Sequence, residues 1–80
     1  MEKQEIQTRV KSVVSKVLKI SVEEIGDEAN FVFDLGSDSM QSVQLVAAFD
    51  EEFDIEMEQD KALQIQTVSD AANFIAQYLK

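Results

Sequence analysis

Ser39 is the side chain in this sequence with the clearest capacity for chemistry. It lies in residues 34–40, which read Asp-Leu-Gly-Ser-Asp-Ser-Met. Asp38 is a good N-cap residue, and Gln41 stands three places later, which is the spacing of a capping-box variant. We therefore expect Ser39 in the first turn of a helix, exposed beside unpaired backbone N–H groups at the positive end of the helix dipole. A hydroxyl group in this position is suited to carrying a phosphate.

Other site chemistries find little support in the sequence. It contains no His and no Cys, which removes Ser-His and Cys-His nucleophilic catalysis and the common zinc sites. Its two Gly are too few for a phosphate-cradling loop. Calcium-loop registers that start at Asp27 or Asp34 place Gly or apolar residues at ligand positions, so both registers fail. Loop structure and helix capping explain Asp34 and Asp38 better than acid–base catalysis does. We expect no catalytic residue and no metal site.

The sequence around Ser39 resembles the attachment site of acyl carrier proteins. The signature of that family is Asp-Ser-Leu after Leu-Gly, followed by Val-x-Leu-Val and a closing Glu-Glu-Phe. Here residues 35–46 read Leu-Gly-Ser-Asp-Ser-Met-Gln-Ser-Val-Gln-Leu-Val, and residues 50–54 read Asp-Glu-Glu-Phe-Asp. The resemblance extends upstream to residues 31–35 and downstream to Thr67 and Val68, so it covers nearly the whole chain. An Asp-Ser pair alone would favour simple helix capping, but the length, charge and flanking pattern favour a carrier.

This resemblance implies a 4′-phosphopantetheine that a phosphopantetheinyl transferase joins to Ser39 through a phosphodiester. The chain itself would catalyse nothing. The terminal thiol of the arm would carry acyl groups as thioesters, on which acyltransferases and synthase enzymes with basic docking patches act. The flexible arm would present its cargo to each docked enzyme at high effective concentration. Fatty cargo in this family folds into the helical bundle, and the residues expected to line that cavity are Val32, Phe49, Met57, Ala62, Leu63, Ile65 and Phe74.

The charge of the chain is unevenly distributed. Its net charge is −9, yet residues 1–20 hold five bases and two acids, while residues 21–60 hold thirteen acids and no Lys or Arg. This acidic middle contains Ser39, so its surface is expected to repel nucleic acid and attract basic partners. No apolar block follows the N-terminus and no apolar run is long enough to span a bilayer. We expect a cytoplasmic monomer without membrane insertion.

Apolar periodicity predicts an all-α fold over a single domain, residues 1–80. The expected architecture is a four-helix bundle with one short helix and a long loop between the first two helices. The first helix spans about 3–19 and buries Ile6, Val10, Val13, Val14 and Val17. The connection 20–37 is expected to contain a helical turn at Ser21–Ile25 and to anchor Phe31 and Leu35 in the core. A short third helix is expected near 59–64. Thr67 caps the last helix, whose apolar stripe is Val68, Ala71, Ala72, Ile75, Tyr78 and Leu79.

Residues 39–53 are predicted to form the second helix. Val43, Leu45, Val46, Phe49 and Phe53 fall on its inner arc, and Asp50 also falls there, which is a mismatch. By resemblance, the surface that partner enzymes contact should surround Ser39. The residues expected on it are Asp38, Met40, Gln41, Gln44, Ala47 and Glu51.

Four functions are candidates at this point. The first is a carrier in fatty acid or related lipid biosynthesis. The second is a carrier for a specialised pathway, such as polyketide, peptide or lipopolysaccharide lipid synthesis, because Gln41 and Gln44 stand where housekeeping carriers commonly have acids. The third is an acidic helical interaction module without a prosthetic group. The fourth is a small enzyme, which the absence of His and Cys disfavours.

Overall fold

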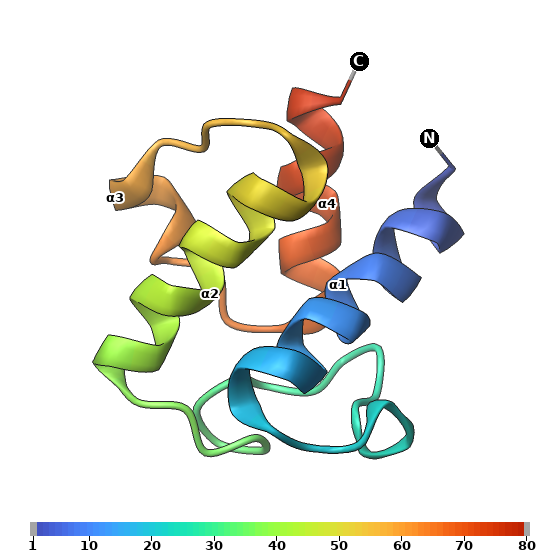
Figure 1. Cartoon of the computed structure of the whole chain (residues 1–80), viewed down its shortest axis with the longest axis vertical. Coiled ribbons are helices and arrows are strands. Elements are labelled where there is room, and N and C mark those ends of the chain that lie inside the picture. Colours follow the sequence, from blue (N-terminus) through green and yellow to red (C-terminus); the bar gives the residue numbers. More distant parts are fainter. Residues whose placement is uncertain (1, 80) are drawn as a thin grey trace.

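The computed structural model describes residues 2–79, and the statements below concern that part of the chain. Its elements are helix α1 (Lys3–Leu18), the 3₁₀ turn η1 (Val22–Glu24), and helices α2 (Ser39–Phe53), α3 (Gln59–Ala62) and α4 (Val68–Tyr78) (Figure 1). Within residues 2–79 the only β-type pairing is one antiparallel bridge between Asn30 and Thr67. The predicted all-α fold, with one short helix and a long first loop, is confirmed.

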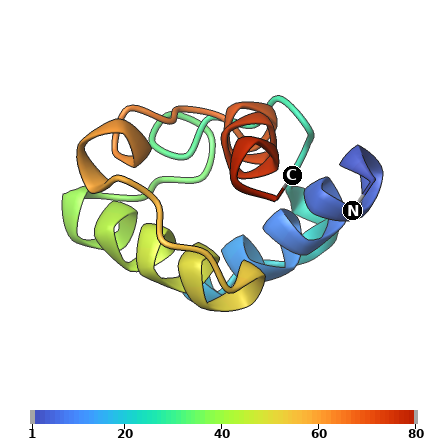
Figure 2. The same cartoon turned by 90° about the horizontal axis from the view of Figure 1, so that it is seen from above.

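Helix α1 packs against both α2 and α4, whereas the segment that carries α3 runs along the other side of α2 (Figures 1 and 2). The buried residues of α1 are Ile6, Val10, Val13 and Val14, as the periodicity predicts. β-Branched residues lower intrinsic helix propensity, so this helix owes its stability to the burial of that stripe.

The inner face of α2 follows the prediction except at one residue. Leu45, Val46, Phe49 and Phe53 are buried, but Val43 is 43 % exposed. The prediction for Val43 was wrong because this side of α2 faces a groove against residues 56–59, and that short irregular segment covers it only in part. In α4, Val68, Ala71, Ala72 and Ile75 are buried as predicted, whereas Tyr78 is 38 % exposed.

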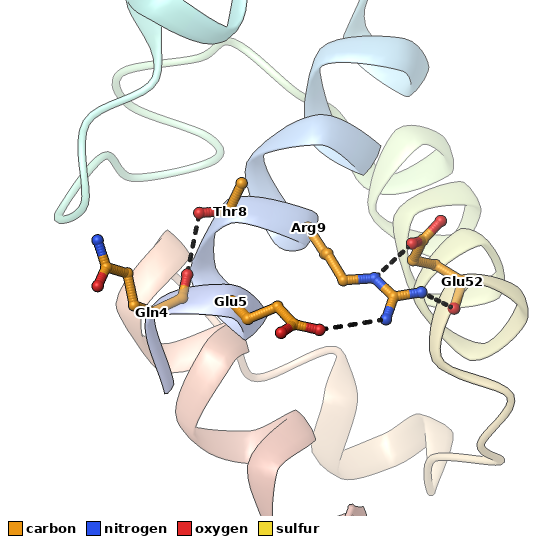
Figure 3. Close-up of polar contacts among 5 residues, drawn as sticks. All are labelled: Gln4, Glu5, Thr8, Arg9 and Glu52. Atoms are coloured by element: carbon orange, nitrogen blue, oxygen red, sulfur yellow. Dashed lines mark hydrogen bonds and ion pairs between the residues drawn. The ribbon is translucent and has the colours of Figure 1, made fainter. Parts of the chain in front are cut away.

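Arg9 ties α1 to the C-terminal end of α2 (Figure 3). Its Nε donates to Glu52 Oε2 at 2.7 Å, and a second guanidinium nitrogen donates to the Glu52 carbonyl oxygen at 3.0 Å. The guanidinium also lies over the Phe53 ring, 5.1 Å from its centroid. A cation at the carbonyl end of a helix interacts favourably with the negative end of the helix dipole. Arg9 therefore holds the C-terminal end of α2 against α1.

The long connection before α2 is bonded to the start of α4. The Phe31 N–H donates to the Gln66 carbonyl at 2.9 Å, and the Val68 N–H donates to the Ala29 carbonyl at 3.1 Å. Phe31 is 5 % exposed and Leu35 packs against the core, which confirms both predicted anchors. Ser21 caps η1 by accepting from the Glu23 N–H, as expected. These contacts fix the point from which the chain enters α2.

Two side chains hold the segment that follows α2. Asp50 Oδ1 accepts the Met57 N–H at 3.0 Å, and the Tyr78 hydroxyl accepts the Glu58 N–H at 3.2 Å. The first of these bonds explains why a carboxylate lies among the apolar residues of α2, because Asp50 satisfies a backbone donor of the following segment. Helix α3 then spans only four residues, fewer than the expected 59–64.

Candidate functional site

The N-terminus of α2 is built as the sequence predicts. Asp38 is the N-cap residue, and its Oδ1 accepts the Gln41 N–H at 2.8 Å. Gln41 Oε1 in turn accepts the Asp38 N–H at 3.2 Å, so the capping box is complete. Gly36, with a φ of 71°, makes the left-handed turn that leads into it, a conformation that residues with a Cβ rarely adopt. Together these contacts place Ser39 at the first helical position.

Three serines near this point have different surroundings. Ser37 is 4 % exposed, and its Oγ donates to the Phe31 carbonyl at 2.9 Å. Ser42 is half-buried, and its Oγ donates to the Asp38 carbonyl at 3.0 Å. Ser39 is exposed, and its hydroxyl has no hydrogen-bond partner among residues 2–79. Only Ser39 therefore combines access from solvent with an uncommitted hydroxyl group.

The backbone beside Ser39 suits a phosphate ester. The N–H groups of Ser39 and Met40 belong to the first turn of α2 and have no acceptor within the described residues. Such amides, at the positive end of a 15-residue helix, stabilise a negative group placed next to them. The described residues around Ser39 thus fit an anionic group on its Oγ.

Four of the residues expected to contact partners form one exposed row on α2. Met40, Gln44, Ala47 and Glu51 follow one another at intervals of four, three and four residues, which places them on one face of a helix. Met40 is 72 % exposed. Asp38 is exposed as well but serves as the cap. Gln41 is half-buried, and its side chain is engaged in the capping box. It therefore stabilises the start of α2 and is not a part of the exposed row.

The residues expected to line an acyl cavity do not all come together. Phe49, Ala62, Leu63 and Ile65 are among the residues that line a small pocket of about 20 Å³ between α2 and α3. The other three expected residues do not line this pocket. Val32 is 54 % exposed on the loop, Met57 lies on the groove along Val43, and Phe74 lines a groove between α3 and α4. This pocket has room for about one water-sized molecule.

Sequence reasoning missed several residues that shape the site. Asn30 Oδ1 accepts the N–H groups of both Val32 and Phe33 at 2.9 Å, and Asp34 Oδ2 accepts the Asn30 N–H at 2.7 Å. The spacing of Asn30 and Asp34 was an available signal, because both residue types bond to nearby backbone groups in turns. The hydrogen bond from the Met57 N–H to Asp50 also had a signal in the sequence, because Asp50 is a carboxylate on the otherwise apolar arc of α2.

Comparisons with known proteins define the class to which this chain belongs. The family model described as "Phosphopantetheine attachment site" matches residues 8–75. The chain is therefore a member of the phosphopantetheine-bearing carriers, which are acted on by partner enzymes and catalyse nothing themselves.

Curated relatives give the family more closely. The acyl carrier protein of Caulobacter vibrioides (strain NA1000 / CB15N) is 47 % identical over 73 residues, which cover 91 % of this chain and 94 % of the relative. The acyl carrier protein of Phenylobacterium zucineum (strain HLK1) is 48 % identical over 71 residues, which cover 89 % and 90 %. This chain belongs to the acyl carrier protein family. No helix within residues 2–79 is long and apolar enough to cross a membrane.

Proposed function

We propose that Ser39 carries the 4′-phosphopantetheine arm, and that the chain carries acyl intermediates on it as thioesters in fatty acid or related lipid biosynthesis. The observation that supports this assignment is the exposed, unpartnered Ser39 hydroxyl at the first position of α2. In the reaction the hydroxyl oxygen attacks the pantetheine-bearing phosphate of coenzyme A, a phosphodiester forms, and adenosine 3′,5′-bisphosphate leaves. The capping box holds the serine in place for a transferase.

The arm supplies a terminal thiol that carries the acyl group, and the residues of this chain do the rest. The exposed amides of Ser39 and Met40 stabilise the phosphodiester charge. Met40, Gln44, Ala47 and Glu51 provide a contact face for acyltransferases and synthase enzymes. Phe49, Ala62, Leu63 and Ile65 line the pocket that an acyl chain would enlarge. The acidic stretch 21–60 steers enzymes with basic patches toward this end of the molecule.

The test is the intact mass of the protein after co-expression with a phosphopantetheinyl transferase. The parent chain should gain the mass of one phosphopantetheinyl group, and Ser39→Ala should gain none while keeping its helical circular dichroism. Ser42→Ala is the matched control, since it removes a neighbouring hydroxyl group of α2 and should still be modified. A parent that gains no mass would contradict the proposal and leave the acidic interaction module. Modification of Ser39→Ala would show that another residue carries the arm.

A specialised pathway is the second candidate, and Gln44 is the residue that favours it. Gln44 is exposed on the contact row where housekeeping carriers commonly have an acid. Gln44→Glu restores the charge without disturbing the capping box, whereas a change at Gln41 would alter the start of α2. If the chain serves a specialised pathway, Gln44→Glu should improve acceptance by a malonyl transferase and ketosynthase of bulk fatty-acid synthesis, and salt should reduce the gain. No gain over a parent that these enzymes already accept well would favour the first candidate.

A further inference from the structure

Phe33 is the most exposed large apolar residue of the described chain. Its exposed fraction is 87 %, whereas that of Phe31, two residues earlier in the same loop, is 5 %. Val32 beside it is 54 % exposed, and Leu63 across a cleft is 44 % exposed. An aromatic side chain costs free energy when it is left in water, and its burial against a partner removes a large apolar area from solvent. We call the surface formed by Val32, Phe33 and Leu63 the apolar turn.

The backbone under Phe33 is fixed. Its N–H donates to Asn30 Oδ1, and the Asp34 and Leu35 N–H groups both donate to the Asn30 carbonyl at 2.9 and 3.0 Å. The buried ring of Phe31 anchors this loop in the core. The Phe33 side chain is therefore presented on a rigid support, which lowers the entropy that binding must remove.

The apolar turn lies at the same end of the molecule as Ser39. Val32, Phe33 and Leu63 line a cleft of about 580 Å³ together with Ser42, which is three residues beyond Ser39 on α2. In Figure 1 this loop and the first turn of α2 lie together at the lower end of the molecule. An enzyme that acts on the Ser39 hydroxyl must reach this end of α2, so the apolar turn lies next to the area it covers.

The charged residues nearest to Phe33 in the sequence are acids, whereas Lys61, two residues before Leu63, is paired with Glu58 at 3.6 Å. Asp34 and Asp38 follow Phe33 and are exposed, and no Lys or Arg occurs from residue 21 to residue 60. A complementary surface would combine an apolar pocket with cations at its rim. Exposed aromatic residues inside a polar rim are the usual anchors of protein interfaces.

We propose that Phe33 is an anchor by which the phosphopantetheinyl transferase that modifies this chain docks, with the ring in an apolar pocket bordered by Arg or Lys. This inference rests on the proposed attachment of the arm to Ser39. It adds a specificity determinant that lies on the loop, outside the contact row of α2. Phe33 touches no reacting atom and acts by increasing the affinity of the docked complex.

The experiment measures the rate at which the apo chain becomes holo, as a function of its concentration, with the transferase that gives the mass gain above. Phe33→Ser should raise the KM for the apo chain by about tenfold and leave kcat nearly unchanged, because removal of an anchor weakens binding without altering the chemistry. Phe33→Leu should recover a part of the loss. The ratio of the KM values of Phe33→Ser and the parent should persist at high salt, since an apolar contact is not screened.

Val22→Ser is the matched control, because Val22 is also apolar and is 45 % exposed, but lies on η1. It should leave KM unchanged, and unaltered circular dichroism should show that each variant is folded. Equal KM values for Phe33→Ser and the parent would overturn the inference while the modification of Ser39 stands, whereas a parent without a mass gain would remove the proposed function itself. A parent that dimerises in light scattering while Phe33→Ser does not would also overturn it, because a second copy would then occupy the patch.

Discussion

The connections before and after α2 differ in how their backbones are held. Before α2, residues 27–31 bond to residues 66–69, and Asn30 and Asp34 close a turn with their side chains. After α2, residues 55–58 depend on Asp50 and on the Tyr78 hydroxyl, and α3 adds a single turn of helix. The proposed attachment serine thus follows the connection that is bonded to the start of α4, and α3 follows the connection that depends on Asp50 and Tyr78.

The largest effect on stability is expected from Phe31→Ala. Phe31 is buried, so its truncation should cost about 3–5 kcal/mol of the free energy of unfolding, a large part of the stability of a small domain. Urea unfolding followed by circular dichroism measures the loss. Phe33→Ala, on the same loop but 87 % exposed, should stay within about 0.5 kcal/mol of the parent. Similar losses in the two variants would show that the loop is not held by Phe31.

The next effect is expected from Asn30→Ala. Its side-chain oxygen accepts two backbone N–H groups, so the variant should lose about 1–2 kcal/mol of the free energy of unfolding. The amides of Val32 and Phe33 should exchange faster than in the parent. Asn73→Ala, an exposed Asn of α4, serves as the control and should not destabilise the protein. Unchanged exchange at Val32 and Phe33 would mean that the backbone alone holds the turn.

A smaller and more local loss is expected from Asp50→Ala. It leaves the N–H of the buried Met57 without its acceptor, at a cost of about 1 kcal/mol. The effect should appear as faster amide exchange in residues 55–63, with little change in residues 27–37. Asp50→Asn keeps an oxygen at this position and should lose less. Equal losses in the two variants would show that the charge of Asp50, rather than its hydrogen bond, matters.

The smallest effect concerns the parent chain in different salts. Residues 54–66 should exchange their amide hydrogens faster than residues 40–50 at low ionic strength, and added salt or divalent cations should narrow the difference. The acids at positions 50, 51, 52, 54, 56, 58 and 60 repel one another, and no proline restricts the segment. Native-state hydrogen exchange measures this directly. Equal protection of the two regions at low salt would contradict the expectation that residues 54–66 open more readily than residues 40–50.

Sequence alone determined the features that depend on residues three or four positions apart. The Asp38 and Gln41 pair set the start of α2, and Thr67 set the start of α4 by accepting the Asp70 N–H. The apolar spacing of α1 predicted its buried stripe correctly. Such local hydrogen bonds and periodic faces are encoded within a single helical turn, so they need no knowledge of the neighbouring elements. The placement of Ser39 follows from them.

Tertiary structure decided which apolar and charged residues of the irregular segments are covered. Phe31 and Phe33 are the same residue type two positions apart, yet only Phe31 is buried, and no period in residues 20–37 separates them. Val43 fits the inner arc of α2 but is half-exposed because residues 56–59 cover it only in part, and Asp50 is satisfied by a backbone amide seven residues away. Burial and hydrogen bonds between elements depend on what packs opposite a residue, and that partner lies outside the residue's own helical turn.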